Sequence, residues 1–383
     1  MVSPPAESLV GRHPRRTFAL GLTVTVVAAA LTSSQLQWKP LLEKSWLTVA
    51  AMGVTDSLIV RLGARMGFFR DEGLDIGFDD IKIVTSGPES LRLLDRGDVD
   101  VAYSTYVPFV FSALDPKIDD VAVVAPTSSA RPHSCVIVAN PVSGIKSPQQ
   151  LVGKKVAVTA EESQSAAMLS ARLLEVGIDP DDVDIVSVQF SEMVRRVEDG
   201  TLDAAFLTDP YLSMATIDYE AVEAFDIGAG KLFGIPTAGF GAKVKFKEEH
   251  PNTVAAFRRG MKRATEYARA HSKDLAREVW ESAGIRKDVA LRGTKLHLET
   301  RIDESELQRV PDLMRDVGMT KGSVDAGDLL VSWPTSTGHD SQSARLPTLV
   351  GVGLAGRYIT CRRVSSVRRQ ALRSHKRHSP VRA

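Results

Sequence analysis

One segment of this sequence occurs twice, and this repetition limits the possible folds more than any other feature. Residues 95–105 read Asp-Arg-Gly-Asp-Val-Asp-Val-Ala-Tyr-Ser-Thr, and residues 198–208 read Glu-Asp-Gly-Thr-Leu-Asp-Ala-Ala-Phe-Leu-Thr. In each copy a glycine ends a helix, an aspartate leads into a strand, and an aromatic residue precedes a final threonine. Residues 72–75 and 176–179 also match, at nearly the same offset. Chance recurrence of the helix–glycine–strand pattern is the alternative, but two matches in the same order favour two lobes of one architecture.

Short apolar strands alternate with helical segments from residue 46 onward, which is typical of an α/β fold with largely parallel sheets. We therefore expect each lobe to be a mixed, mainly parallel sheet flanked by helices. Ser147 followed by Pro148 and Gln150 predicts a capping box that starts another helix. The expected strands are 46–52, 99–103, 155–158, 185–188 and 204–207, and the expected helices are 56–66, 88–96, 163–175, 191–198, 254–270, 273–283 and 303–317, with 326–333 closing the pattern.

The N-terminus has the composition of an export signal. Arg12, Arg15 and Arg16 precede an apolar run at 18–31, which is shorter than the ~20 residues of a typical spanning helix. Residues 1–35 are therefore interpreted as a secretory signal, with an uncleaved anchor as the alternative. The arginine pair resembles the twin-arginine pattern, so we expect export to the periplasm or the outer face of the cell membrane by that route or by general secretion. No cysteine follows the apolar run, which argues against lipid attachment there.

Composition excludes several function classes. The chain has 48 Lys and Arg against 47 Asp and Glu, so its net charge gives no reason to expect a nucleic-acid partner. Cys135 and Cys361 are its two cysteines, too few for a disulfide framework or a cysteine-based metal site. The sequence also lacks a Gly-rich phosphate loop, a Ser/His/Asp order and an H-E-x-x-H motif. We therefore expect no catalytic residue, no metal and no cofactor.

The last fifty residues differ from the rest of the chain. Residues 334–383 carry ten Lys and Arg and one acid, Asp340, with little amphipathic order. Such a composition is typical of a disordered basic tail. A frameshifted or read-through C-terminus would look the same, and binding of nucleic acid or of a surface is a third interpretation.

Candidate ligand-binding residues follow from the expected strands. In open α/β sheets, ligands bind beyond the carboxyl ends of strands, where helix N-termini present free N–H groups. This rule, together with the repeat, places Thr105 and Thr208 on opposite walls of one cleft. The selected residues are Thr55, Asp56, Ser86, Gly87, Ser104, Thr105 and Tyr106 in the first lobe, and Thr159, Glu161, Ser163, Gln164, Asp209 and Tyr211 in the second.

Several of these residues also have purely structural interpretations. Asp56, Ser163 and Asp209 could cap helices. Tyr106 and Tyr211 could pack on the lobes instead of enclosing a ligand ring.

Three more residues lie near the predicted crossover between the lobes. Arg131 and His133 could contact an anionic ligand or report pH, or they could brace the hinge. Cys135 lies in an apolar strand and is expected to be a small buried residue.

Five motifs together resemble the type II periplasmic binding proteins of the nitrate/sulfonate/taurine and thiamine-pyrimidine-precursor (NMT1/THI5-like) group. They are residues 67–75, 97–102, 144–156, 200–205 and 250–254, and the resemblance covers residues 46 to 333. It implies a discontinuous first lobe (46–130 plus 234–333), a second lobe (133–233) and two crossing strands that act as a hinge. It also implies a monomeric, non-catalytic substrate-binding protein that gives its small-molecule ligand to an ABC-type permease with a separate ATPase subunit.

The predicted cleft is more acidic than a site for a small anion should be. A sulfonate or nitrate site requires Arg or Lys and helix N-termini without carboxylates. Asp56, Glu161, Glu162 and Asp209 lie in the selected segments, and Arg131 is the clearest cation. We therefore expect a pyrimidine-like or amine-bearing solute in preference to nitrate, sulfonate or taurine.

Two other functions were weighed against transport. An enzyme on the same fold, acting on a pyrimidine or related small molecule, would need an acid/base group in the cleft, and His133 with Glu161 or Asp209 is the candidate set. Relatives that make the thiamine pyrimidine use a Cys-rich segment, which this sequence lacks. A ligand-sensing domain of a regulator is disfavoured by the export signal.

Overall fold

The computed structural model describes residues 40–115, 120–293 and 297–329. The predicted export signal (1–35) and basic tail (334–383) lie outside these ranges. No helix in the described part of the chain is both long enough and apolar enough to cross a membrane.

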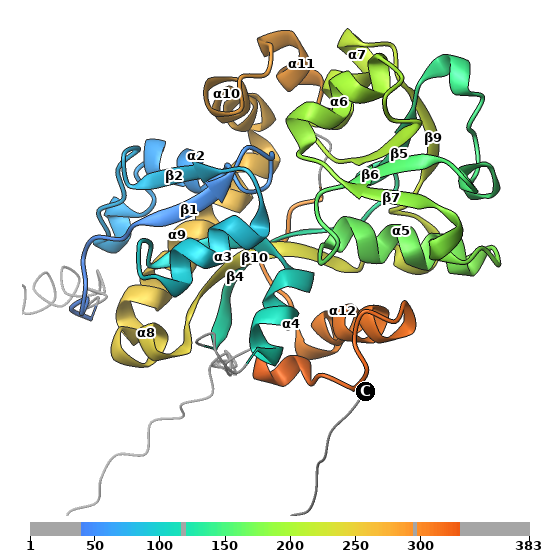
Figure 1. Cartoon of the computed structure of the whole chain (residues 1–383). Coiled ribbons are helices and arrows are strands. Elements are labelled where there is room, and N and C mark those ends of the chain that lie inside the picture. Colours follow the sequence, from blue (N-terminus) through green and yellow to red (C-terminus); the bar gives the residue numbers. More distant parts are fainter. Residues whose placement is uncertain (1–39, 116–119, 294–296, 330–383) are drawn as a thin grey trace, which may run out of the picture. The chain divides into compact units, whose positions relative to one another are not determined.

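The first of two five-stranded sheets has the order β2-β1-β3-β10-β4, and its strands β1, β2, β4 and β10 are labelled in Figure 1. β1, β2 and β3 are parallel, whereas β10 runs antiparallel to both β3 and β4. Its strands are β1 (Val49–Met52), β2 (Ile81–Val84), β3 (Val101–Thr105), β4 (Val121–Ser129) and β10 (Pro236–Lys243). The helices that follow or flank them are α2 (Ile59–Arg65), α3 (Gly87–Asp95), α4 (Tyr106–Leu114), α8 (Val244–Glu249), α9 (Pro251–Ala270), α10 (Ser272–Ser282) and α11 (Lys287–Arg292).

The second sheet repeats this arrangement with the order β7-β6-β8-β5-β9. β6 is parallel to β7 and β8, and β5 is antiparallel to β8 and β9. Its strands are β5 (Val136–Ala139), β6 (Lys155–Val158), β7 (Asp184–Ser187), β8 (Ala204–Leu207) and β9 (Val222–Asp226), and its helices are α5 (Gln164–Glu175), α6 (Phe190–Glu198) and α7 (Tyr211–Asp218). The two copies of the sequence repeat form β3 and β8, each the middle strand of its sheet. The expected two-lobed α/β fold with mixed, mainly parallel sheets is therefore confirmed.

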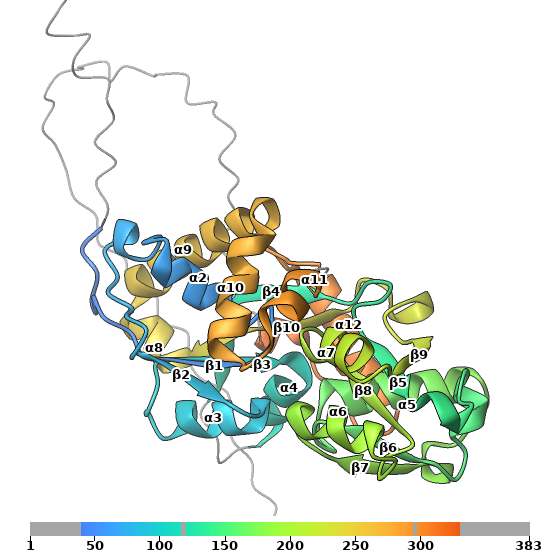
Figure 2. The ribbon, with the colours of Figure 1, turned by 90° about the horizontal axis from the view of Figure 1, so that it is seen from above.

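The chain passes between the sheets twice, from β4 to β5 and from β9 to β10 (Figure 2). Helix α12 (Glu304–Asp316) follows later and contacts both α4 and α5. Short 3-10 helices complete the fold at η1 (Arg70–Glu72), η2 (Pro141–Ser143), η3 (Pro148–Leu151), η4 (Pro180–Asp182), η5 (Gly230–Leu232) and η6 (Ala326–Asp328). Elements from both sheets therefore meet along the path of the two crossings.

Burial explains why the central strands read as continuous apolar runs. Every residue of β1, β5 and β8 is buried, because helices cover both faces of a mainly parallel sheet. The helices bury one face each, as in α9, where Phe257 stacks on Phe69 at a ring distance of 5.5 Å. The core of each sheet therefore lies on both sides of its parallel strands.

Two local predictions need correction. The expected capping box at Ser147 is wrong: the segment forms the short η3, and the Ser147 side chain caps nothing. Oε1 of Gln150 instead accepts a hydrogen bond from the backbone N of Lys146 at 2.8 Å. The segment 326–333 was expected to close the pattern of strands and helices, but its described residues, 326–329, form only the short 3-10 helix η6 and the residue after it. A capping box does start α12, where Asp303 and Glu306 bond each other's backbone N–H groups.

Candidate functional site

A cavity of about 80 Å³ lies where the carboxyl ends of strands from both sheets meet. Most of its polar lining atoms are hydroxyls, and the rest of its wall is aliphatic, aromatic and sulfur-containing. The lining residues are Met52, Val54, Asp56, Ser86, Gly87, Pro88, Tyr103, Thr105, Pro108, Ser128, Ser129, Ser134, Cys135, Thr159, Ala160, Ser163, Gln164, Ser165, Met168, Phe190, Phe206, Thr208, Thr237 and Ala238.

The structure brings about half of the predicted site residues to this cavity. They are Asp56, Ser86, Gly87, Thr105, Thr159, Ser163 and Gln164. Thr208, the counterpart of Thr105 in the sequence repeat, also lines it, so the two repeat copies contribute to one cavity.

Asp56 lies on the wall formed by the first sheet and is 5% exposed. Its carboxylate accepts hydrogen bonds from the hydroxyls of Tyr103 (3.0 Å), Thr127 (2.8 Å) and Ser128 (2.6 Å). The capping alternative for Asp56 is wrong, because α2 starts at Ile59 without a side-chain cap. Three donors hold this carboxylate at the edge of the cavity, where burial without partners would be costly.

The N-terminus of α3 contributes the next part of the wall. Ser86 is the N-cap and accepts a hydrogen bond from the backbone N of Glu89 at 3.3 Å. A Cβ atom on Gly87 would lie 2.5 Å from Oγ of Ser104, so a larger residue would force the helix and β3 apart. Gly87 therefore allows the helix end to lie directly against the end of the strand.

The N-terminus of α5 faces the cavity from the second sheet. Ser163 caps this helix by accepting a hydrogen bond from the backbone N of Ala166 at 3.2 Å, which confirms the capping alternative. Oγ of Ser165 bonds both Ser163 (2.8 Å) and Thr159 (2.9 Å), and it accepts from the Thr159 backbone N. These hydroxyls fix the loop between β6 and α5. The N-terminus of α5, with its partial positive charge, therefore faces the cavity.

Gln164 is the least satisfied polar side chain of the cavity. It is 3% exposed, and neither its Nε2 nor its Oε1 has a hydrogen-bond partner among the described protein atoms. Buried amides are normally paired, because an unpaired one costs about 1–3 kcal/mol. Gln164 therefore offers one donor group and one acceptor to a molecule in the cavity.

Thr55, Ser104 and Tyr106 lie behind the cavity wall instead of lining it. Tyr106 is fully buried and packs against Phe109 at a ring distance of 6.1 Å. Burial raises the pKa of its phenol far above the ordinary value. The expectation that Tyr106 encloses a ligand ring is thus replaced by its packing role.

Asp209 and Tyr211 connect α7 to the first sheet. Asp209 accepts hydrogen bonds from the backbone N (3.2 Å) and Oγ (2.7 Å) of Ser213 in the first turn of α7, although the N-cap position itself is Pro210. Tyr211 stacks on Phe190 with the ring centres 5.3 Å apart. The backbone N of Thr55 donates to the carbonyl of Asp209 at 3.3 Å. Both predicted residues therefore contribute to contacts outside the cavity lining.

The charged candidates other than Asp56 lie away from the cavity. Arg131 pairs with Glu299 at 3.6 Å and stacks over Phe233 at 4.6 Å, which matches the bracing interpretation. His133 is exposed, and its Nδ1 lies 2.9 Å from a carboxylate oxygen of Glu223. Glu161 is exposed as well. The structure does not bring His133, Glu161 and Asp209 together as a candidate acid/base set around the cavity.

The sequence prediction missed the residues that the crossing segments contribute. Ser128, Ser129 and Ser134 come from the first crossing, and Thr237 from the second, where it bonds Ser128 at 2.8 Å. A run of hydroxyl residues at the end of β4 was the available signal.

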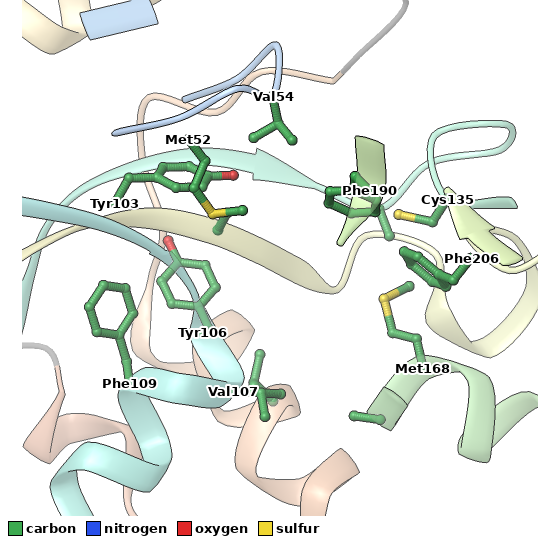
Figure 3. Packing of buried hydrophobic residues seen from close by; sticks show 14 of the residues in the cluster. Met52, Val54, Tyr103, Tyr106, Val107, Phe109, Cys135, Met168, Phe190 and Phe206 are labelled. Atoms are coloured by element: carbon green, nitrogen blue, oxygen red, sulfur yellow. The ribbon is translucent and has the colours of Figure 1, made fainter. Parts of the chain in front are cut away.

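The apolar part of the cavity wall is shown in Figure 3. Met52, Val54 and Tyr103 lie on one side, and Phe190, Phe206 and Met168 on the other.

Cys135 also lines the cavity, in addition to being buried as predicted. Burial raises the pKa of its thiol to about 12. The thiol is therefore neutral near pH 7 and unsuited to nucleophilic attack.

The electrostatic character of the cavity follows from its lining. Asp56 is its one carboxylate, and none of the described lining residues is Arg, Lys or His. No group of His, Cys, Asp and Glu side chains within the described ranges could hold a metal ion. The arrangement can bind a small, largely uncharged or cationic molecule through hydroxyls, one amide, one carboxylate and two helix ends.

Comparisons with known proteins identify relatives of this chain. Over 141 residues the chain is 33% identical to a Bacillus subtilis (strain 168) protein named as an aliphatic sulfonates-binding protein, covering 37% of this chain and 41% of that protein. Over 174 residues it is 27% identical to the taurine-binding periplasmic protein of Escherichia coli (strain K12), covering 45% and 52%. The chain thus spans about half the length of the curated relatives it matches.

A solved structure shares the fold over a longer range. The alkanesulfonate-binding protein SsuA from Xanthomonas axonopodis pv. citri, bound to MOPS, superposes with a TM-score of 0.62 and 17% identity. The match covers 75% of this chain and 98% of that one. The family model described as NMT1/THI5 like matches residues 55–274, which is more than half of the chain. The protein therefore belongs to the NMT1/THI5-like family.

Proposed function

We propose that this protein is the extracytoplasmic solute-binding component of an ABC importer. In this proposal the segments 46–130 with 234–333 and the segment 133–233 are two lobes that close on one small organic molecule. The protein acts as a monomer and delivers its ligand to a membrane permease, whose separate ATPase subunit supplies the energy. Export depends on residues 1–35, through the twin-arginine or the general secretion route.

The observation that carries this proposal is the cavity at the junction of the two sheets, in which the Gln164 amide has no partner among the described residues. Both sheets contribute strand ends and one helix N-terminus each to this cavity. A molecule bound there would touch both lobes, so its binding energy would favour their closure. The names of the relatives, which describe binding proteins, support the same class of function.

For the ligand, we propose a pyrimidine-like or amine-bearing solute in preference to nitrate, a sulfonate or taurine. Asp56 can accept from an amino group, and the Gln164 amide can pair with adjacent donor and acceptor atoms on the edge of a heterocycle. A hard anion would meet the Asp56 carboxylate without any arginine or lysine among the described lining residues. The names of the two curated relatives point to sulfonates, so the ligand assay must include them.

Binding without catalysis is supported by the state of the titratable side chains in the cavity. The Asp56 carboxylate is held by three hydroxyls. Burial holds the pKa of Cys135 at about 12, and burial first and then the nearby Asp56 raise the pKa of Tyr103 well above its ordinary value. Neither the Cys135 thiol nor the Tyr103 phenol is therefore poised near pH 7 as an acid, base or nucleophile. An enzyme on the same fold remains the alternative, and it predicts turnover.

The proposal is tested by calorimetric titration of the full-length protein with aminopyrimidines, primary amines, taurine, ethanesulfonate and nitrate. We expect one molecule bound per chain, recovered unchanged by mass spectrometry. Chemical conversion of the bound molecule would refute the transport function. Binding of taurine, ethanesulfonate or nitrate with no response to amines or heterocycles would refute the proposed ligand class.

A substitution of Asp56 tests whether its carboxylate contacts the ligand. Asp56→Asn should weaken binding of an amine ligand by about 10- to 100-fold, because a hydrogen bond to a charged group contributes about 1.5–3 kcal/mol. Asp79→Asn is the matched control, since Asp79 is exposed and outside the cavity. Equal amine affinity in Asp56→Asn and the unmodified protein would show that the carboxylate does not contact the ligand.

A further inference from the structure

A second depression lies next to the crossing segments. Three arginines line it, whereas none of the described residues that line the ligand cavity is Arg, Lys or His. We call it the hinge pocket; its volume is about 240 Å³. It shares Ser128 and Ser129 with the ligand cavity, so the end of β4 forms a wall of both. The charged residues that line it are Arg131, Arg301, Arg309, Glu299 and Glu306.

The three arginines reach the hinge pocket from three separate segments. Arg131 lies on the first crossing, Arg301 between residue 299 and the start of α12, and Arg309 on α12 itself. Nη1 of Arg131 and Nη1 of Arg309 lie 2.9 and 3.5 Å from the position that a Cβ atom of Gly234 would occupy. Two guanidinium groups therefore converge on one point beside the second crossing.

Both carboxylates of the hinge pocket already have other partners. Oε1 of Glu299 accepts a hydrogen bond from Ser129 (2.6 Å) and lies 3.2 Å from His297 and 3.6 Å from Arg131. Glu306 accepts from the backbone N of Asp303 in the capping box of α12. Glu299 is therefore already paired with Arg131, whereas a hydrogen bond from a neutral N–H group orients the Glu306 carboxylate toward the start of α12.

Neither Arg301 nor Arg309 forms an ion pair with a carboxylate among the described residues, although Arg301 interacts electrostatically with the carboxylate of Asp303. Nη2 of Arg309 donates to the carbonyls of Lys231 (3.1 Å) and Phe233 (2.9 Å), which fixes the guanidinium and leaves Nη1 directed toward Gly234. Arg301 is exposed at the rim. The planar guanidinium of arginine matches the geometry of carboxylate and phosphate groups, which it can bind with two parallel hydrogen bonds.

We propose that the hinge pocket binds a small oxyanion through Arg301, Arg309 and Arg131. This site is separate from the ligand cavity, and it does not depend on the ligand or on the transport function proposed above. The bound group would join the first crossing, the start of β10 and α12. An anion there would therefore restrain the two crossing segments.

The test is calorimetric titration of the full-length protein with sodium phosphate, sodium sulfate and sodium acetate, each against sodium chloride at equal ionic strength. We expect saturable binding of at least one of the three oxyanions. Arg301→Gln and Arg309→Gln should each weaken it by about tenfold, since one charge-assisted hydrogen bond is lost. Arg315→Gln, which removes an exposed arginine of α12 outside the pocket, should leave the affinity unchanged.

Hydrogen exchange locates the bound anion. Protection should appear at residues 130–135 and 231–236 and be lost in Arg301→Gln, a variant that changes only an exposed side chain. Protection at residues 163–166 instead would place the anion at the N-terminus of α5 and overturn the proposal. Absence of saturable binding, or an equal loss in Arg315→Gln, would overturn it as well.

Discussion

Replacing Gln164 with methionine should make the protein more stable and impair ligand binding. The amide is 3% exposed and unpaired among the described protein atoms, so its burial costs about 1–3 kcal/mol in the ligand-free protein. Methionine has a similar shape and nearly the same helix propensity at this first position of α5. We therefore expect Gln164→Met to raise the free energy of unfolding by about 1–3 kcal/mol.

The measurement is urea and thermal unfolding of the full-length protein without ligand. In a body of this size each kcal/mol corresponds to roughly 2 °C in the unfolding midpoint, so the shift should be measurable. Gln149→Met is the control, because Gln149 is exposed and should change stability by less than about 0.5 kcal/mol.

Ligand affinity should change in the opposite direction. Loss of one donor and one acceptor should weaken binding by about tenfold or more. If Gln164→Met is instead less stable than the unmodified protein, the amide is satisfied in the free state and the reasoning is refuted. If stability rises and affinity is unchanged, Gln164 does not contact the ligand.

Two further predictions concern packing and reactivity. Gly239→Ala should lower the free energy of unfolding by about 1–3 kcal/mol, because its Cβ would lie 2.7 Å from the hydroxyl of Tyr106 and 2.8 Å from the carbonyl of Ala125. Urea unfolding measures this loss, and Gly322→Ala is the control because the space around Gly322 is open. Equal losses of stability in the two variants would contradict the argument. Cys135 should react with iodoacetamide very slowly at pH 8.5 and faster only as the pH approaches 12, because burial favours the neutral thiol. Peptide mass spectrometry measures this rate, and rapid labelling at pH 8.5 in the folded protein would show that the thiol is accessible and ionised.

The sequence by itself determined the architecture, because its signals are local. The copies of the repeat at 95–105 and 198–208 carry a glycine stop and a strand pattern that act over a few residues, so they could be recognised without the structure. The caps at Ser163 and Asp303 obey the same local rules. The equal strand orders of the two sheets follow from this doubled pattern.

Local signals were insufficient where a side chain had two possible partners. Asp56 could cap a helix or accept hydrogen bonds from residues far away in the sequence. In the structure it accepts from Thr127 and Ser128, which are 71 and 72 residues away. Ser147 shows the same limit, since its predicted capping box forms only a 3-10 turn.

Only the tertiary structure decided which polar groups are paired and which remain available. Arg131 forms an ion pair with Glu299 and stacks over Phe233, whereas Gln164, which the sequence marks only as a residue at a helix start, is buried without a partner among the described residues. The physical reason is that hydrogen bonding and desolvation depend on the three-dimensional surroundings of an atom, which segments far apart in the sequence provide. The sequence thus predicted the two-lobed α/β fold, and the packing of the two sheets decided the chemistry of the cavity between them.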